Sequence, residues 1–173
     1  MMGEKITIRG LDIFYSEHQQ TMIASGNAEL IHPNFTILAD HIRYNKKTST
    51  IEGQDNVEMI QHNQVILSDS FHYNTKTNIM TINNLTLELT TQEKHQQIYA
   101  KASHFYDHNH IKKGKKGRLT TCSFDPPHYY LEAESFTIYP NQRIIGQNIT
   151  LVNPVLFLPL GFWSPAYIFE LGK

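Results

Sequence analysis

Apolar and polar residues alternate along most of this chain. The alternation is clear in two stretches, Phe35, Ile37 and Ala39, and Leu85, Leu87 and Leu89. A period of two places successive side chains on opposite faces of a strand. Polar turns at 45–47, 74–76 and 140–142 interrupt the pattern and predict strands of about six residues. No window has the period of a helix.

A six-residue motif recurs, with a small residue, an acidic or polar one, and then an apolar-x-apolar pair. Its copies lie at 10–15, 39–44, 68–73 and 133–138, with a looser one at 102–107. Tyr15, Tyr44 and Tyr73 close the first three copies and are 29 residues apart. After three of the copies, a polar turn leads to an apolar run that ends in glycine and asparagine, at 22–27, 51–56 and 144–148.

These repeats predict antiparallel hairpins stacked into a long meander. The apolar face of such a sheet has to be covered, so we expect the sheet to fold over on itself. The expected fold class is therefore all-β, a folded-over antiparallel β-jelly roll or solenoid-like meander with open ends. Open ends have unpaired backbone donors and acceptors, and they join partners by strand addition or aggregate.

Composition agrees with a strand-rich globular chain. Nineteen Ile and fifteen Thr stand against seven Ala among 173 residues, and β-branched side chains favour strands over helices. Charged residues make up 18% of the chain and the formal net charge is -1. A nucleic-acid binder has to neutralise many phosphates, so this balance excludes nucleic acid as the expected partner. The length predicts one domain of ordinary size.

The single cysteine, Cys122, excludes an internal disulfide and a multi-thiolate metal site. No secretory signal opens the sequence, because the first residues lead directly into strand-like alternation. Residues 144–169 contain no charge, which suggests a membrane span of the required ~20 residues. The prolines and asparagines in this stretch argue against a span, and we expect short strands broken by turns.

The final third of the chain resembles a known family. Three segments carry the resemblance: Gly117 to Pro127 with Thr121-Cys122-Ser123 and Asp125-Pro126, Tyr130 to Glu134, and Asn148 to Pro159 with Pro154-Val155-Leu156-Phe157-Leu158-Pro159. They resemble the periplasmic N-terminal domain of the LptD (OstA-like) lipopolysaccharide-assembly proteins. The earlier repeats are similar to the OstA-like module shared with LptA, in which an Ala-Asp-x-x-x-Tyr strand alternates with a Gly-x-Asn-Val strand. Residues 53–57, Gly-Gln-Asp-Asn-Val, fit the second strand with one inserted residue.

The resemblance implies a function in transport. The family's domain is an open β-jelly roll that carries lipopolysaccharide acyl chains through the periplasm to the outer membrane, in a bridge of similar domains driven by an inner-membrane ATPase. It implies residues 1–152 as the OstA-like domain and 153–173 as a Pro-rich segment leading toward an outer-membrane barrel. The implied partners are lipopolysaccharide, an LptA-like domain joined by edge-strand addition, and the barrel with its plug lipoprotein. In the full-length family context, the cysteine matching Cys122 forms a disulfide with the barrel.

The candidate trough consists of the apolar pairs of the four clear motif copies. Alternation alone favours an ordinary sandwich core for these residues, whereas the resemblance favours a lipid-binding trough. The candidates are Ile13, Tyr15, Ile42, Tyr44, Phe71, Tyr73, Phe136 and Ile138.

Two polar clusters have a structural and a functional interpretation. His104, Asp107, His108 and His110 lie close in sequence, but ten histidines make chance clustering common, so we expect a polar loop and no metal. The basic run 112–118, with Lys112, Lys113, Lys115, Lys116 and Arg118, fits either a solvated hairpin or a contact with lipid phosphates or an anionic surface.

Catalytic motifs are absent from the sequence. There is no Gly-x-Ser-x-Gly elbow, and residues 114–117 lack the spacing and hydroxyl of a phosphate-binding loop, so we expect neither an enzyme nor a cofactor. Two alternatives to lipid transport remain: a self-assembling structural β-solenoid without lipid cargo, and a lectin-like jelly roll. The lectin is disfavoured because such sites use exposed Trp and paired carboxylates, and the chain has one Trp, Trp163.

Overall fold

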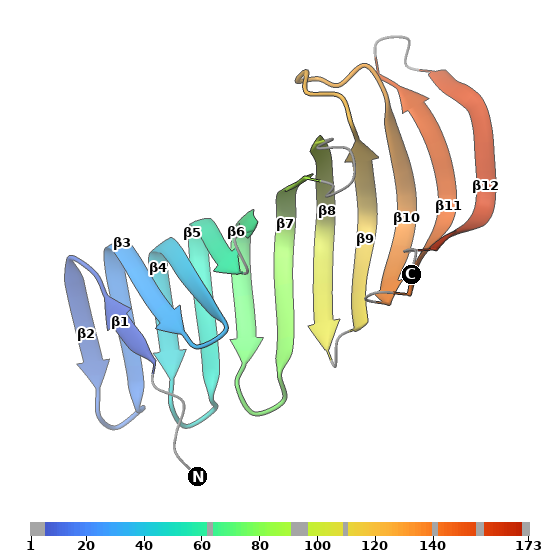
Figure 1. Cartoon of the computed structure of the whole chain (residues 1–173). Helices are drawn as coiled ribbons and strands as arrows, with labels where there is room; N and C mark the ends of the chain where they lie inside the picture. Colours follow the sequence, from blue (N-terminus) through green and yellow to red (C-terminus); the bar gives the residue numbers. More distant parts are fainter. Residues whose placement is uncertain are drawn as a thin grey trace. The chain divides into compact units, whose positions relative to one another are not determined.

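The computed structural model describes residues 6–61, 64–90, 97–108, 111–139, 142–154 and 158–170. All regular elements within these ranges are strands, shown in Figure 1. They are β1 (Thr7–Arg9), β2 (Asp12–Ser16), β3 (Thr21–His32), β4 (Phe35–Asn45), β5 (Thr50–Gln61), β6 (Gln64–Asn74), β7 (Ile79–Thr90), β8 (Gln97–His108), β9 (Ile111–Thr120), β10 (Tyr130–Tyr139), β11 (Arg143–Asn153) and β12 (Leu158–Glu170). The described part of the chain has no helix that could cross a membrane.

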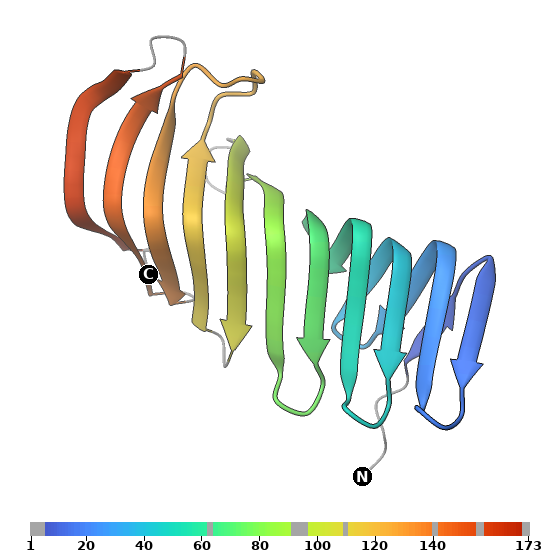
Figure 2. The ribbon, with the colours of Figure 1, turned by 180° about the vertical axis from the view of Figure 1, so that it is seen from behind.

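The strands form one open antiparallel sheet, which confirms the all-β fold class. Its order is β1-β3-β4-β5-β6-β7-β8-β9-β10-β11-β12, and β2 pairs with β3 beside β1. Figure 2 shows the same succession from behind. Apart from the start of the sheet, each strand pairs with its neighbours in sequence, as the predicted meander requires.

Most strands are about twice as long as the sequence predicted. The reason is that the Gly-Asn and Asp-Asn pairs are corners within a strand and not turns between strands. Gly26, Asn27, Asp55 and Asn56 have φ between +49° and +69°, and the strand pairing shifts register beside each pair. Two six-residue halves therefore join through a bulged corner, where the left-handed conformation suits Gly, Asn and Asp.

The 29-residue spacing of the sequence is repeated in the backbone. Left-handed residues lie at Gln20, Ser49 and Asn78 in successive hairpin turns, and at 26, 55 and 84 in successive corners. The turns also bond to one another, because Lys46 N donates to Gln20 O at 2.9 Å and Thr75 N donates to Ser49 O at 2.8 Å. One repeat is therefore one hairpin of the sheet.

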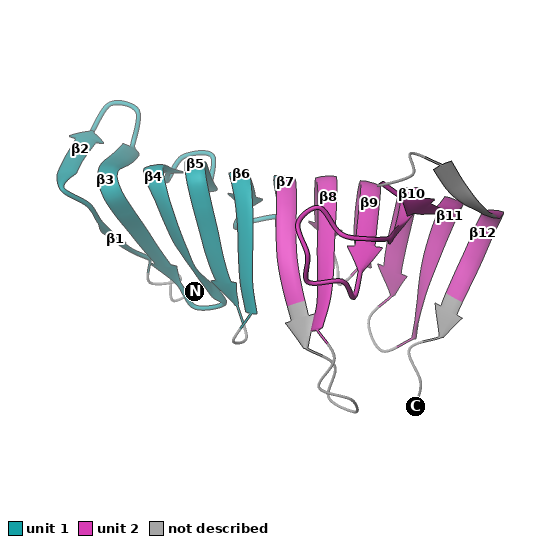
Figure 3. Ribbon diagram, turned by 90° about the horizontal axis from the view of Figure 1, so that it is seen from above, with its two compact units in different colours: residues 1–83 teal, residues 84–173 magenta. Residues whose placement is uncertain are grey.

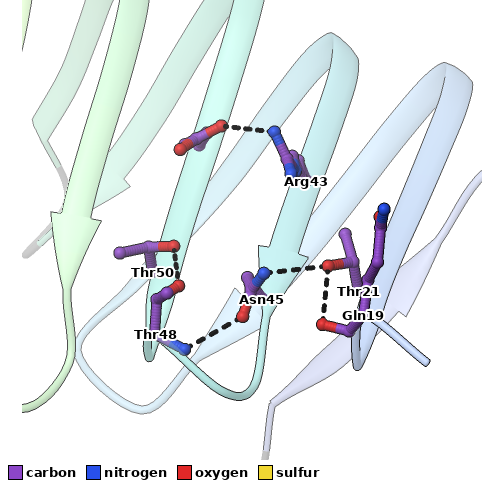
Figure 4. Close-up of polar contacts among 7 residues, drawn as sticks. Gln19, Thr21, Arg43, Asn45, Thr48 and Thr50 are labelled. Atoms are coloured by element: carbon purple, nitrogen blue, oxygen red, sulfur yellow. Dashed lines mark hydrogen bonds and ion pairs between the residues drawn. The ribbon is translucent and has the colours of Figure 1, made fainter. Parts of the chain in front are cut away.

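Polar side chains close the hairpin between β4 and β5, as Figure 4 shows. Asn45 Oδ1 accepts from Thr48 N at 2.9 Å, while Asn45 Nδ2 donates to Thr21 Oγ1 at 2.9 Å. The amide thus holds its own turn and ties it to the neighbouring hairpin, which explains the asparagine at the end of this strand.

The chain divides into two compact units, Met1–Asn83 and Asn84–Lys173, coloured separately in Figure 3. The sequence predicted one domain to residue 152 followed by a Pro-rich segment at 153–173. In the structure, Leu158–Glu170 of this segment is β12 and pairs with β11. Among the described strands β12 is an edge, the position at which a sheet tolerates Pro159 and Pro165.

The sheet of unit 1 folds over on itself. Strand pairing aligns Thr36 with Ile60 and Ile60 with Val65, which puts Phe35 at the level of residue 64. In a flat sheet Phe35 and Phe71 would therefore be about 23 Å apart along the strands, at ~3.3 Å per residue. Their ring centroids are instead 5.4 Å apart. The corners therefore bring the two halves of the strands face to face.

Candidate functional site

The motif copies of unit 1 align in the sheet. Strand pairing places Ile13, Ala24, Ile42, Gly53 and Phe71 in one cross-strand row. A second row, two residues along each strand, consists of Tyr15, Met22, Tyr44, Ile51 and Tyr73. Six of the eight candidate trough residues thus lie in two adjacent rows on one face.

These rows differ sharply in exposure from one strand to the next. Ile13 and Tyr15, on β2, are 52% and 54% exposed. Ile42, Phe71 and Tyr73 are buried, packed in the folded-over core, and Tyr44 is half-buried. An acyl chain would reach the three buried residues only if the two halves of the sheet separated, so their role in lipid binding stays a prediction.

The second apolar face lies in unit 2, on strands β8 to β12. One row consists of Phe105, Gly114, Phe136, Gly146 and Tyr167. Two glycines in this face make room for the Phe136 ring: a Cβ at Gly114 would lie 2.0 Å from the ring, and one at Gly117 would lie 2.7 Å from it. Lys116, between these glycines, has φ of +49° and forms a corner in β9, so the ring lies over both sides of this corner on its inner side.

Alternation extends this inner face along the strands in both directions. Ile138 and Ile144 face each other two residues beyond Phe136 and Gly146, and Leu131 lies between Leu119 and Leu151 on the other side of the corner. We call this the inner face of unit 2, defined by Phe105, Leu119, Leu131, Phe136, Ile138, Ile144, Ile149, Leu151 and Tyr167.

The inner face of unit 2 is partly exposed to solvent, whereas the two rows of unit 1 are buried at Ile42, Phe71 and Tyr73. Among the described apolar residues beyond residue 83, only Leu85, Ala102 and Ile149 are buried. Leu119 and Tyr167 are 41% and 46% exposed, and most of the other apolar members are half-buried. The glycines at 114, 117 and 146 leave room on this face for the side chains of Phe136 and Ile149, and most of the other apolar side chains of the face are partly exposed.

One ion pair borders this face. Lys112 Nζ lies 2.6 Å from Asp107 Oδ2 and 5.8 Å from the centroid of the Phe105 ring. These two charged residues share a row with Ile138 and Ile144. The lysine is neutralised by its partner, so the face keeps an apolar character up to this row.

The histidine cluster of the sequence does not converge. His104 Nδ1 contacts Ser103 Oγ, Asp107 pairs with Lys112, and His108 packs against the Tyr106 ring. His110 lies outside the described residues. No group of three or more metal-ligating side chains occurs in the described ranges.

Cys122 lies in the loop between β9 and β10 and is a free, half-buried thiol. Its Sγ accepts a hydrogen bond from His128 N at 3.4 Å and lies 3.6 Å from His128 Nδ1. Thr120 and Thr121 hydrogen-bond Tyr129 and close the loop. The loop thus holds the thiol in an ordered position, and the disulfide that the family resemblance implies for it stays a prediction.

The sequence identified two members of the open face, Phe136 and Ile138, and missed the rest. Apart from Leu131, which precedes the motif copy of β10, the missed residues lie on strands without a clear motif copy. Their signal was the pair of glycines at 114 and 117, which lie within the basic run 112–118.

Comparison with known proteins adds a likeness at the level of structure. No protein-family model matches the chain, and the search of curated protein sequences found no match. One similar solved structure is LptH, described as the LptA homologous periplasmic component of the conserved lipopolysaccharide transport device from Pseudomonas aeruginosa. The TM-score is 0.49, with 9% sequence identity over 61% of this chain and 76% of LptH. Identity this low does not transfer a function from one protein to the other.

Proposed function

We propose that this chain carries the acyl chains of lipopolysaccharide on the inner face of unit 2. The proposal rests on one observation. The apolar side chains of this face are partly exposed, whereas Ile42, Phe71 and Tyr73 of unit 1 are buried. Acyl chains need a long dry surface, and each methylene buried contributes about 0.8 kcal/mol. An open sheet lets the sugar and phosphate head remain in water, so binding and transfer need no chemistry on the lipid.

We further propose that the chain acts as the periplasmic N-terminal domain of an LptD-type protein, associated with the outer membrane. The segments around Cys122 and Pro154 to Pro159 support this placement, since they are the parts that resemble LptD and not LptA. In this role Cys122 forms a disulfide with the barrel that the family carries, and the barrel and its plug lipoprotein receive the lipid.

The direct test of this function is a binding titration of purified protein with lipopolysaccharide, read out by displacement of a fluorescent fatty-acid probe. We expect saturable displacement by lipopolysaccharide and none by its delipidated polysaccharide. Absence of probe binding, or displacement by the polysaccharide alone, would contradict the proposal.

The sheet edge at β1 and β2 is the proposed docking position for an LptA-like domain. Both strands pair with β3 on one side only, and Leu11 and Phe14 beside them are 79% and 64% exposed. An edge with free backbone groups and exposed apolar side chains favours strand addition. The same edge would serve the alternative function, a self-assembling solenoid without lipid.

Proline at Thr7 is expected to weaken self-association of the chain through this edge. Thr7 pairs with Ile31, and a proline in an edge strand removes a backbone donor and hinders pairing with an incoming strand. Sedimentation velocity over a range of concentrations should show a weaker self-association for Thr7→Pro, while its circular dichroism stays that of the parent. Unchanged association with an unchanged spectrum would move the docking edge elsewhere.

A further inference from the structure

The outer side of unit 2 has a cluster of lysines without acidic partners. Lys101, Lys113, Lys115 and Lys116 form no ion pair among the described residues, and all four are exposed. The other two cations of the run are neutralised, Lys112 by Asp107 and Arg118 by Glu132 at 2.7 Å. The basic run is therefore divided: Lys112 on the inner face and Arg118 on the outer side are paired, and the other outer lysines are left for another partner.

Two cations face each other across these strands. Lys101 lies opposite Arg118, and Glu132 pairs with Arg118 from the next strand, so two cations share one carboxylate. Directly opposed like charges are destabilising, so an anion over this pair would stabilise it.

The backbone conformation at Lys116 is a further unusual feature of this lysine cluster. Lys116 occupies the corner of β9 with φ of +49°, a conformation that side chains other than Asn and Asp rarely adopt. Left-handed corners also occur in β3, β5, β7 and β11, at Gly26 with Asn27, Asp55 with Asn56, Asn84 and Asn148. Lysine therefore occupies the one left-handed corner that lies within the lysine cluster, where the other left-handed corners have Gly, Asn or Asp.

An exposed tryptophan lies on the same outer side. Strand pairing forms a single row from Lys101 through Arg118, Glu132 and Thr150 to Trp163, which is 64% exposed. Residues 118 and 132 alternate with the inner-face residues Leu119 and Leu131, so this row faces away from the inner face. Cations together with an exposed Trp are typical of proteins that sit at a membrane-water interface.

We propose that the outer side of unit 2 docks on the surface of an anionic phospholipid membrane. Lys101, Lys113, Lys115 and Lys116 approach the phosphates, and Trp163 enters the headgroup region. The occupant is a membrane and not the phosphates of the acyl-chain cargo, because the lysines and the inner face lie on opposite sides of the same sheet. The inference is independent of the proposed lipid transport.

Vesicle binding tests this assignment with the protein's own probe. Trp163 is the single tryptophan of the chain, so its emission reports on this surface alone. We expect vesicles of phosphatidylglycerol and phosphatidylcholine to shift the emission to the blue, with an affinity that falls as salt is raised. Vesicles of phosphatidylcholine alone should leave the emission unchanged.

The decisive variant is Lys113→Gln, Lys115→Gln, Lys116→Asn, whose last change introduces the residue found at the other corners. Each lysine near an anionic surface contributes about a fivefold gain in affinity, so we expect roughly 100-fold weaker binding. The matched control, Lys46→Gln, Lys47→Gln, Lys76→Gln, removes the same charge from exposed turns of unit 1 and should bind like the parent.

Three outcomes would overturn the proposal: equal loss in both triple variants, no loss in the first, or equal binding to neutral vesicles. Removing the inner face with Phe136→Asp should leave vesicle binding intact. Loss of vesicle binding in that variant would instead assign the contact to the acyl-chain face.

Discussion

Replacing Phe71 by alanine is expected to lower the free energy of unfolding by about 3–5 kcal/mol, the usual cost of removing a large aromatic side chain from a packed core. Phe71 is 2% exposed, and its ring contacts Phe35 from the opposite half of the folded-over sheet. The substitution leaves a cavity at the contact that closes unit 1. Urea unfolding followed by circular dichroism measures the change.

The matched control for this prediction is Phe14→Ala. Phe14 is also a strand phenylalanine of unit 1, but it is 64% exposed. Its removal should change the stability by no more than about 0.5 kcal/mol. Similar losses in the two variants would mean that unit 1 has no closed core at Phe71.

Placing a carboxylate on the inner face of unit 2 is expected to abolish lipid binding. Phe136→Asp removes the ring over Gly114 and Gly117 and puts a charge where acyl chains would lie. An unpaired charge against hydrocarbon costs several kcal/mol, so we expect at least about a 100-fold loss of lipopolysaccharide affinity. The probe-displacement titration measures this loss directly.

Two variants separate this effect from a general loss of structure. Thr137→Asp adds the same charge one position away, on the outer side, and should bind lipopolysaccharide like the parent. Phe136→Leu keeps an apolar side chain over the glycines and should retain most of the affinity. Full binding by Phe136→Asp would place the lipid elsewhere.

The sequence was a good guide to the period of the sheet. The motif copies at Ile13, Ile42 and Phe71 became one cross-strand row because a 29-residue repeat equals one hairpin. Hairpins between neighbouring strands follow from local turn chemistry, and asparagines such as Asn45 indicate the turns in the sequence. The all-β class and the meander order were therefore accessible from pattern alone.

The corners and the exposure of each row could not be predicted from the sequence. A Gly-Asn pair serves a turn or a strand corner equally well, since both need a left-handed residue, and only the register of the neighbouring strands distinguishes them. Whether Ile42 is buried and Ile138 half-buried depends on how far each unit closes. How far each sheet folds over depends on contacts between residues that are distant in sequence. In unit 2 the residues opposite Phe136 are glycines, which contribute nothing to a hydrophobic pattern.

Photo-crosslinking at neighbouring positions of β10 and β11 tests the central claim most directly. Ile138 and Ile144 belong to the inner face, whereas Thr137 and Ile145 face each other on the outer side of the same two strands. With a photoreactive residue at each position in turn and lipopolysaccharide in excess, we predict capture of lipid from Ile138 and Ile144 and none from Thr137 or Ile145. Equal capture from all four positions, or no capture from any, would contradict lipid transport on this face.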